Sequence, residues 1–334
     1  MNKDILPPLS TITKNNTNNS NKYSDDEEIL EEIRKTEKQI DIDGSFSATF
    51  DDGASFKNMI EYLRLSNMFG FFIFTKDTII YQNGNKENTI LNKVLIETYE
   101  LTKYTFDSKS NEIIICINLS QLRDITKGVG RNDHVNIFRI KGEPNNLYIH
   151  IRSQGETGSS EPNKFLLPCS TSDITIYDMP PYERPINNPT CTVNLKEFSK
   201  FCKYVVTIKC NHVTVHGFKN GVMFKGITHY DTIGSVKEFG ECTDDKPVLK
   251  LDGFSQENVK IIKPTGPKPI LRIRKLGEVE KFKISIPIIK YLIKLNGLCI
   301  GGTVKLYIEK DVPLKMICNI GSFGKMTTYL SSLE

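Results

Sequence analysis

The chain contains an internal repeat, and this repeat limits the folds open to it more than any other feature. Phe56–Leu63 (FKNMIEYL) recurs as Phe198–Val205 (FSKFCKYV), and Ile117–Lys127 (INLSQLRDITK) recurs as Ile284–Lys294 (ISIPIIKYLIK). The second segment of each half is followed by a short loop with glycine and then by an alternating strand, Val135–Ile140 or Val304–Ile308. The repeat therefore predicts two halves with the same order of strand, helix, several strands, helix and hairpins.

The repeated segments have the spacing of amphipathic helices, and short strand-like segments lie between them. Apolar residues recur at i, i+3, i+4 and i+7, which places them on one face of a helix; in the first helix they are Phe56, Met59, Ile60 and Leu63. The strand-like segments alternate or are rich in β-branched residues. They are Phe71–Thr75, Thr78–Tyr81, Thr89–Ile96, Ile113–Ile117 and Leu147–Ile151 in the first half, and Val213–His216, Val222–Lys225, Ser235–Phe239 and Leu271–Lys275 in the second. Helices packed on antiparallel sheets predict an α+β fold.

Positive charge is concentrated on the outward faces of the predicted helices. The net charge is only +4, so composition by itself does not indicate a nucleic-acid-binding protein. Each helix nevertheless carries cations opposite its apolar face, and these are Lys57, Arg64, Arg123, Lys127, Lys196, Lys200, Lys203, Lys290 and Lys294. If the repeat sets the helices side by side, the cations share one surface that attracts a phosphate backbone without reading bases. For a single helix the ordinary alternative is a solvated face, and Glu61, Asp124 and Glu197 dilute the charge.

The last stretch of the chain carries the most specific pattern. Thr303–Glu309 alternates as a strand, Asp311–Leu314 (DVPL) makes a tight turn, and Lys315–Ile320 alternates back, which predicts an antiparallel hairpin. A second turn at Gly321–Gly324 leads into Met326–Leu330 (MTTYL). This order of strand, Asp-Val-Pro-Leu, return strand, glycine and final Tyr-Leu resembles the C-terminus of PCNA-type sliding DNA clamps, the processivity factors of DNA polymerases.

The resemblance covers residues 46–334 in helix spacing, connector and terminal hairpin. It implies the DNA clamp fold, with two similar βαβββαββ-type halves and helices on one face of antiparallel sheets. It also implies a homotrimeric ring around double-stranded DNA that is opened by a clamp loader and serves DNA polymerase and other replication and repair proteins. The cations named above would line the hole, although Asn58, Asp124 and Pro287 stand where the family often has a cation. No cofactor, metal or membrane contact is implied.

Two further surfaces follow from the resemblance. The pocket for partner peptides would be formed by Met179, Tyr182, Pro313, Tyr329 and Ser331, with Asn88 and Thr89 on a nearby first-half loop. The alternative is that Pro313 and Tyr329 only cap a hairpin. Ring closure would pair open edge strands of neighbouring copies, with Asp173, Ile174, Ile176 and Tyr177 on one side and Ser235, Lys237 and Phe239 on the other.

Composition divides the chain into four parts. Residues 1–45 are polar and acidic and predict a flexible tail. Residues 46–177 form the first expected clamp domain. Residues 178–189 are a proline-rich connector that cannot lie in a central strand. Residues 190–334 form the second domain, with an insertion near residues 242–269 that is longer than any hairpin requires.

No catalytic motif emerges, and an enzyme is not expected. The chain has no G-x-x-x-x-G-K-[ST] phosphate loop, and His212 and His216 share a strand face without a third ligand. The 8 cysteines form no C-x-x-C pair and no signal peptide is recognisable, so reduced thiols are expected. Heavy use of Asn, Lys and Ile suggests an AT-rich genome, either that of a eukaryote or of a large DNA virus. The expected location is the nucleus, or a cytoplasmic viral replication site if the gene is viral.

Another interpretation keeps the fold and changes its role. The chain would then be a PCNA-like transcription factor or a monomeric polymerase accessory subunit whose acidic tail and insertion contact partners. A pull-down enriched in RNA polymerase rather than DNA polymerase would favour this interpretation. An enzyme is the weakest alternative and would require an activity that depends on His212 or His216.

Overall fold

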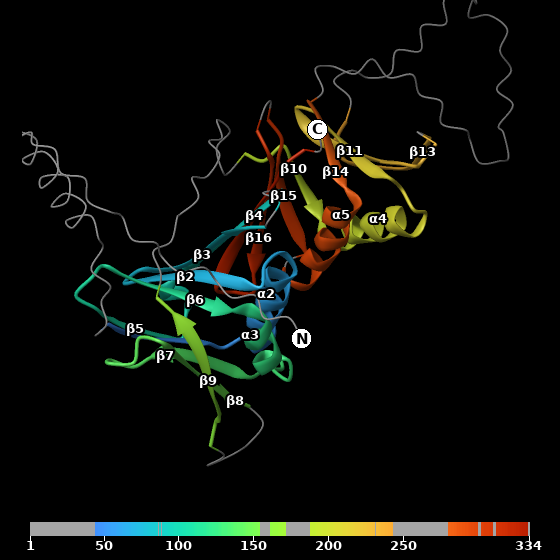
Figure 1. Cartoon of the computed structure of the whole chain (residues 1–334). Helices are drawn as coiled ribbons and strands as arrows, with labels where there is room; N and C mark the ends of the chain where they lie inside the picture. Colours follow the sequence, from blue (N-terminus) through green and yellow to red (C-terminus); the bar gives the residue numbers. More distant parts are fainter. Residues whose placement is uncertain are drawn as a thin grey trace, which may run out of the picture. The chain divides into compact units, whose positions relative to one another are not determined.

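The computed structural model describes residues 44–85, 87, 89–153, 161–171, 188–230, 232–242, 280–299, 302–309 and 312–332 (Figure 1). The predicted tail up to residue 43, the connector up to residue 187 and the predicted insertion beyond residue 242 lie outside these residues. The predicted strand Leu271–Lys275 lies outside them as well.

The first half alternates strands with two helices. Its elements in chain order are β1 (Ser45–Phe50), α2 (Gly53–Ser66), β2 (Phe69–Thr75), β3 (Thr78–Gly84), β4 (Ile90–Glu97), the 3₁₀ helix η1 (Thr98–Glu100), β5 (Lys103–Asp107), β6 (Glu112–Asn118), α3 (Leu119–Thr126), β7 (His134–Arg139), β8 (Asn146–Arg152) and β9 (Asn163–Ser170). Both helices begin at a side-chain cap, because Asp52 accepts from the Ser55 N–H and Asn118 accepts from the Ser120 N–H.

The second half repeats this order, except that no strand among its described residues corresponds to β5. Its elements are β10 (Cys191–Asn194), α4 (Leu195–Thr207), β11 (His212–Gly217), β12 (Asn220–Ile227), β13 (Ile233–Glu241), β14 (Glu280–Ser285), α5 (Ile286–Leu292), the 3₁₀ helix η2 (Ile293–Gly297), β15 (Thr303–Tyr307), β16 (Leu314–Ile320) and β17 (Gly324–Leu330). The segment predicted as a fourth helix is therefore α-helical only to Leu292 and continues as 3₁₀ helix through Lys294.

Strand pairing repeats along with the order of elements. β1 pairs with β7 as β10 pairs with β15, and β2 pairs with β6 as β11 pairs with β14, all antiparallel. The hairpins β2–β3 and β3–β4 correspond in the same way to β11–β12 and β12–β13. The segments β7–β8–β9 likewise correspond to β15–β16–β17. The repeat in the sequence is thus a repeat in the fold.

One strand pair joins the two halves. β17, the last strand of the chain, pairs antiparallel with β4 of the first half, from Lys325 opposite Leu95 to Leu330 opposite Ile90. This pair makes the sheet continuous over 13 strands, in the order β10-β15-β16-β17-β4-β3-β2-β6-β9-β8-β7-β1-β5. A second sheet has the order β13-β12-β11-β14. The C-terminal stretch therefore holds the halves together through a ladder of backbone hydrogen bonds.

The helices contact one another as well as the sheets. α3 packs against α2, α2 packs against α5 and η2, and these two pack against α4. The rings of Tyr62 on α2 and Tyr291 on α5 lie 4.3 Å apart, and Asn58 on α2 donates to the carbonyl of Gly297 in η2 at 2.8 Å. The inner faces carry the predicted apolar residues, since Phe56 and Phe198 are 2% and 1% exposed. The four helices therefore form one layer that crosses from the first half to the second.

After β1, four strands have no counterpart among the predicted segments. β5 is an outer strand with no fully buried residue, and β10 is only 4 residues long. β9 contains Pro168, and a proline within a segment weakens the prediction of a strand. The proline is tolerated in β9 because it lies near the end of the strand, opposite Asn146 of β8. β14 follows directly on residues that the structure does not describe. In each of these segments the alternation of apolar and polar residues is weak, and pairing with a neighbouring strand stabilises the extended conformation.

Candidate nucleic-acid interface

The outward face of α4 carries a stripe of three lysines. Asn194 caps the helix by accepting from the backbone N–H groups of Lys196 and Glu197, at 3.0 and 3.2 Å. Burial of Phe198 and Cys202 against the sheet turns the opposite face to solvent. Lys196, Lys200 and Lys203 are all exposed on that face. Their spacing of four and three residues extends the charge over about 10 Å of helix.

α5 and η2 continue this cationic surface beside α4. Pro287 lies in the first turn of α5, where its missing N–H has no intrahelical role. The hydroxyl of Ser199 on α4 donates to the carbonyl of Ile293, at 3.4 Å, across the contact between the helices. Lys290 and Lys294 are exposed and one turn apart. Within the described residues, none of the five lysines of α4, α5 and η2 forms an ion pair or a side-chain hydrogen bond.

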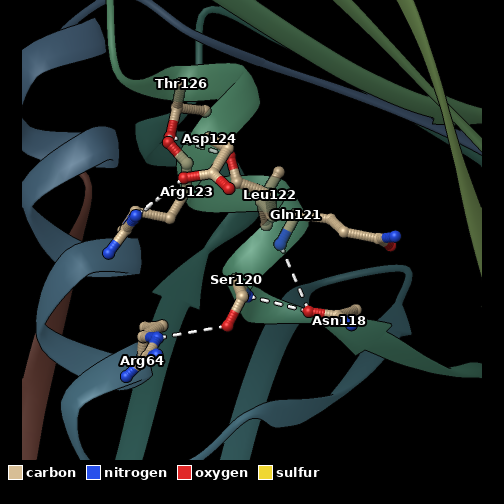
Figure 2. A network of polar contacts seen from close by, with 8 residues as sticks. All are labelled: Arg64, Asn118, Ser120, Gln121, Leu122, Arg123, Asp124 and Thr126. Atoms are coloured by element: carbon tan, nitrogen blue, oxygen red, sulfur yellow. Dashed lines mark hydrogen bonds and ion pairs between the residues drawn. The ribbon is translucent and has the colours of Figure 1, made fainter.

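The first-half cations have a different environment, because three of them contact their own chain. Lys57 Nζ lies 3.4 Å from the carbonyl oxygen of Val129, in the loop after α3. Arg64 donates through Nε to the hydroxyl of Ser120 at the start of α3, at 3.1 Å (Figure 2). Figure 2 also shows Arg123 turned to its neighbour Asp124, with 2.7 Å between Nη2 and Oδ1.

Lys127, which follows α3, is exposed. All the cations predicted to face DNA therefore lie on the helix layer, but Lys57 and Arg64 reach sideways from α2 to α3.

Acidic residues on the layer differ in how far they are neutralised. Glu197 on α4 forms an ion pair with Lys237 of β13 at 2.8 Å, and this hydrogen bond lowers the pKa of Glu197. Glu61 on α2 is exposed, and its carboxylate has no ion-pair partner within the described residues. The first-half helices thus keep uncompensated negative charge that the second-half helices lack.

Part of the predicted partner pocket lies at the end of β17. Tyr329 is buried, Pro313 is half-buried, and the Ser331 N–H donates to the carbonyl of Thr89 at 3.0 Å. This bond brings the chain's end to the loop between β3 and β4, as predicted for Thr89. Met179, Tyr182 and Asn88, which were predicted for the same pocket, lie outside the described residues.

A lysine between two tyrosine rings was not predicted for this region. Lys315 of β16 lies opposite Tyr307 and Tyr329 in the strand register, and its Nζ is 5.1 and 5.9 Å from their ring centroids. Burial lowers the pKa of Lys315, and the charge of Glu309 acts in the opposite direction. In the sequence, this site could have been inferred only from the alternation of apolar and polar residues in the terminal hairpin. That alternation does not show which side chains lie opposite one another.

Of the two strands predicted to form the subunit interface, the structure describes only the one in the second half. Asp173, Ile174, Ile176 and Tyr177 lie outside the described residues. Ser235, Lys237 and Phe239 lie on β13, an outer strand of the second sheet, and Lys237 and Phe239 contact Glu197 and Phe198 of α4. Phe239 is 8% exposed and packs against Phe198 and Phe224, so its side chain belongs to the core. The residues of β13 that face outward with large apolar side chains are Ile233 and Val236, 59% and 46% exposed.

The two histidines considered for a metal site lie on β11, where His216 is buried and His212 is half-buried. In the described ranges, no group of three or more His, Cys, Asp or Glu residues is placed to hold a metal ion. None of the helices that the structure describes is long and apolar enough to span a membrane.

Comparison with known proteins identifies the architecture. No family model matches the chain. A mimivirus protein (Acanthamoeba polyphaga mimivirus) described as "Probable DNA polymerase sliding clamp" is 21% identical over 250 residues, which are 75% of this chain and 46% of that protein. The chain thus spans about half the length of this relative. The crystal structure of Proliferating Cellular Nuclear Antigen from Entamoeba histolytica matches with a TM-score of 0.63 at 17% identity, over 86% of this chain and 99% of that one.

These matches confirm the predicted resemblance to PCNA-type sliding clamps and the predicted α+β clamp fold. The match to the whole length of a solved clamp means that both repeated halves take part in it. The predicted domain boundaries and the assignment of individual site residues stay predictions.

Proposed function

We propose that this chain is the subunit of a sliding clamp that encircles double-stranded DNA and acts as a DNA polymerase processivity factor. The observation that carries the proposal is the continuous layer of α3, α2, α5 with η2, and α4, in which every helix bears exposed or half-buried cations. Such a layer attracts phosphates by charge and offers no base-edge geometry, so contact would be independent of sequence. Many weak, exchangeable contacts allow a ring to slide while it stays topologically bound.

Ring closure is supported by the strand pair that joins the halves. β9 and β13 are the repeat equivalents of β17 and β4, which pair within the chain. Within the described residues, Asn163–Pro168 of β9 pair with β8 alone, and β13 pairs with β12 alone. We infer that β9 of one copy pairs with β13 of the next, in the antiparallel manner of β17 with β4. The predicted edge Asp173–Tyr177 would follow β9 directly along the chain.

The helices support the same closure. In the repeat, Tyr204 of α4 corresponds to Tyr62, and Asp124 of α3 corresponds to Tyr291. The rings of Tyr62 and Tyr291 pack against each other at the junction within the chain, whereas Tyr204 and the Asp124 side chain are 52% and 63% exposed. Between copies, the equivalent contact would set the Tyr204 hydroxyl near the Asp124 carboxylate of the neighbouring copy, as a hydrogen bond to a charged acceptor.

Partners would dock at the end of β17, near Tyr329 and Pro313, where Ser331 donates to the carbonyl of Thr89. Extended peptides with aliphatic and aromatic anchors fit such a surface, because a few buried anchors supply most of the binding energy. A DNA polymerase, a clamp loader and other replication or repair proteins are the proposed partners. The role is that of a scaffold rather than an enzyme, at a nuclear or viral replication site.

Topological retention on DNA tests the proposal. The purified full chain is incubated with linear duplex DNA whose biotinylated ends are then blocked by streptavidin or left open, and salt is raised. A clamp stays on the blocked duplex and slides off the open one, since salt removes phosphate contacts but not a threaded ring. Equal loss from both duplexes would refute the proposal. Mass photometry should show three times the chain mass of 38.0 kDa, whereas a strict monomer would favour the accessory-subunit alternative.

A Tyr329→Ala variant tests the docking surface separately. It should weaken binding of polymerase-derived peptides at least tenfold while topological retention is unchanged, because the pocket and the helix layer are different surfaces. Lys325→Ala, on the same strand but exposed, is the matched control and should bind peptide normally.

A further inference from the structure

The two halves of the chain present unequal charge at equivalent positions of the helix layer. The repeat aligns Ala54, Asn58 and Glu61 of α2 with Lys196, Lys200 and Lys203 of α4. These are the positions opposite the buried stripe of each helix, as the exposure of Glu61 and of all three lysines indicates. α4 thus presents three ammonium groups where α2 presents a methyl group, an amide and a carboxylate.

The cations that α2 does possess lie on its flank. Lys57 corresponds to Ser199; Lys57 donates to the carbonyl of Val129 in the loop after α3, and Ser199 donates to the carbonyl of Ile293 in η2. Arg64, one turn beyond Glu61, donates to Ser120 on α3. These two cations therefore hold α3 against α2, and only part of their charge faces outward, as their half-buried state indicates.

At the second helix of each half the inequality is confined to one position, since the equivalent Lys127 and Lys294 are both exposed. Arg123 and Lys290 are equivalent, but Arg123 is paired with Asp124, whereas Lys290 is followed by Tyr291, which is buried. In the second half the one acidic residue of the layer, Glu197, is drawn toward β13 by Lys237. The field outside the second-half helices is therefore more positive than that outside the first-half helices.

We propose that the second half of each subunit makes most of the contacts with the DNA backbone, through Lys196, Lys200, Lys203, Lys290 and Lys294, while the first half acts mainly as a spacer. This inference rests on the proposed clamp function and adds to it that the duplex is held unevenly around the ring. Around the hole of the ring, strongly cationic second halves would then alternate with weakly cationic first halves. Such an alternation favours a duplex that lies off-centre.

The salt dependence of binding measures the contacts directly. The slope of log K against log [salt] changes by about 0.9 for each phosphate contact of duplex DNA. If Lys200 and Lys203 of one subunit each contact a phosphate, the double variant Lys200→Ala/Lys203→Ala should reduce the slope by about 1.8. The same logic predicts a gain for Asn58→Lys/Glu61→Lys, which gives α2 the charge pattern of α4.

The experiment compares four forms of the full chain on a short duplex by fluorescence anisotropy over a range of NaCl concentrations. Lys200→Ala/Lys203→Ala should decrease the magnitude of the negative slope by at least about one unit. Asn58→Lys/Glu61→Lys should increase the magnitude of the slope. The control Lys76→Ala/Lys219→Ala removes two exposed lysines from the equivalent hairpin turns β2–β3 and β11–β12, away from the helices, and should leave the slope unchanged. Circular dichroism of each variant checks that the fold is kept.

A second comparison separates this inference from the proposed function. Lys57→Ala/Arg64→Ala should change the slope less than Lys200→Ala/Lys203→Ala does. An equal or larger change would overturn the uneven grip while leaving the clamp intact, provided that the wild-type chain is retained on end-blocked DNA. Failure of that retention would overturn the clamp itself.

Discussion

Tyr62 and Tyr204 occupy equivalent positions of the repeat, and truncating each of them should have opposite consequences. Tyr62 is 1% exposed, its ring lies 4.3 Å from that of Tyr291, and its hydroxyl is 3.5 Å from Thr328 Oγ1 of β17. It therefore contacts two elements of the second half from within the first. Tyr204 is 52% exposed on α4, where the next copy would lie in the proposed ring.

The expected magnitudes follow from burial. Truncation of a fully buried aromatic residue to alanine costs about 3–5 kcal/mol, because transfer free energy is lost and a cavity remains. Tyr62→Phe keeps the ring and should cost only about 0.5–1.5 kcal/mol for the hydrogen bond. Tyr204→Ala should change the unfolding free energy by less than about 0.5 kcal/mol. With an m-value of about 3 kcal/mol per molar urea, a loss of about 4 kcal/mol moves the unfolding midpoint by more than 1 M.

Urea unfolding followed by far-UV circular dichroism measures the first consequence, and sedimentation equilibrium measures the second. Tyr62→Ala should lower the midpoint strongly, whereas Tyr204→Ala should leave it in place and weaken self-association. Equal midpoint shifts for the two alanine variants would refute the reasoning from burial. Unchanged self-association of Tyr204→Ala would refute the equivalence between the junction inside the chain and the junction between copies.

Other predictions address pH, backbone conformation and the sheet edge. Burial raises the pKa of Tyr62 and Tyr291 well above the ordinary value of 10.0, so above that pH the unfolded chain releases protons that the folded chain keeps. Stability should fall as pH rises through this range, by up to about 1.4 kcal/mol per pH unit for each tyrosine, and Tyr62→Phe should make the decline less steep in urea titrations. Gly321→Ala should lower the unfolding free energy by more than about 1 kcal/mol, because Gly321 has φ of +51° and a new Cβ would lie 2.8 Å from Ser55 Cβ; calorimetry checks this. Val236→Glu sets a carboxylate on β13, which pairs with β12 alone within the described residues, and should reduce the trimer fraction in mass photometry without lowering the melting temperature of the monomer.

The sequence predicted what depends on local pattern. The stripe Phe56, Met59, Ile60 and Leu63 is buried as expected, since its spacing alone decides which helix face is apolar. The two strands of the predicted terminal hairpin, β15 and β16, pair as expected, and the predicted second turn at Gly321 leads into β17. Periodicity and turn residues are sufficient in such segments because their outcome does not depend on a distant partner.

Features that depend on a partner could not be predicted in the same way. A helical wheel places Lys57 and Arg64 outward, but only the position of α3 turns them into contacts with Val129 and Ser120. The strand β9 was missed because Pro168 weakens its pattern, and its order comes from pairing with β8. Lys315 likewise required the register of neighbouring strands before its place between two tyrosine rings could be known.

The repeat explains why the two halves differ at equivalent positions. The junction inside the chain never has to open, so it can bury Tyr62 against Tyr291 and satisfy Asn58 at the carbonyl of Gly297. In the proposed ring the junction between copies would have to open for loading onto DNA, and a surface that is solvated in the open state cannot carry the same apolar area without cost. Tyr204 and Asp124, both exposed, suit a contact that forms and breaks in water. In the proposed ring, the contact of α2 with α5 and η2 would hold the chain together, whereas α3 and α4 would meet neighbouring copies.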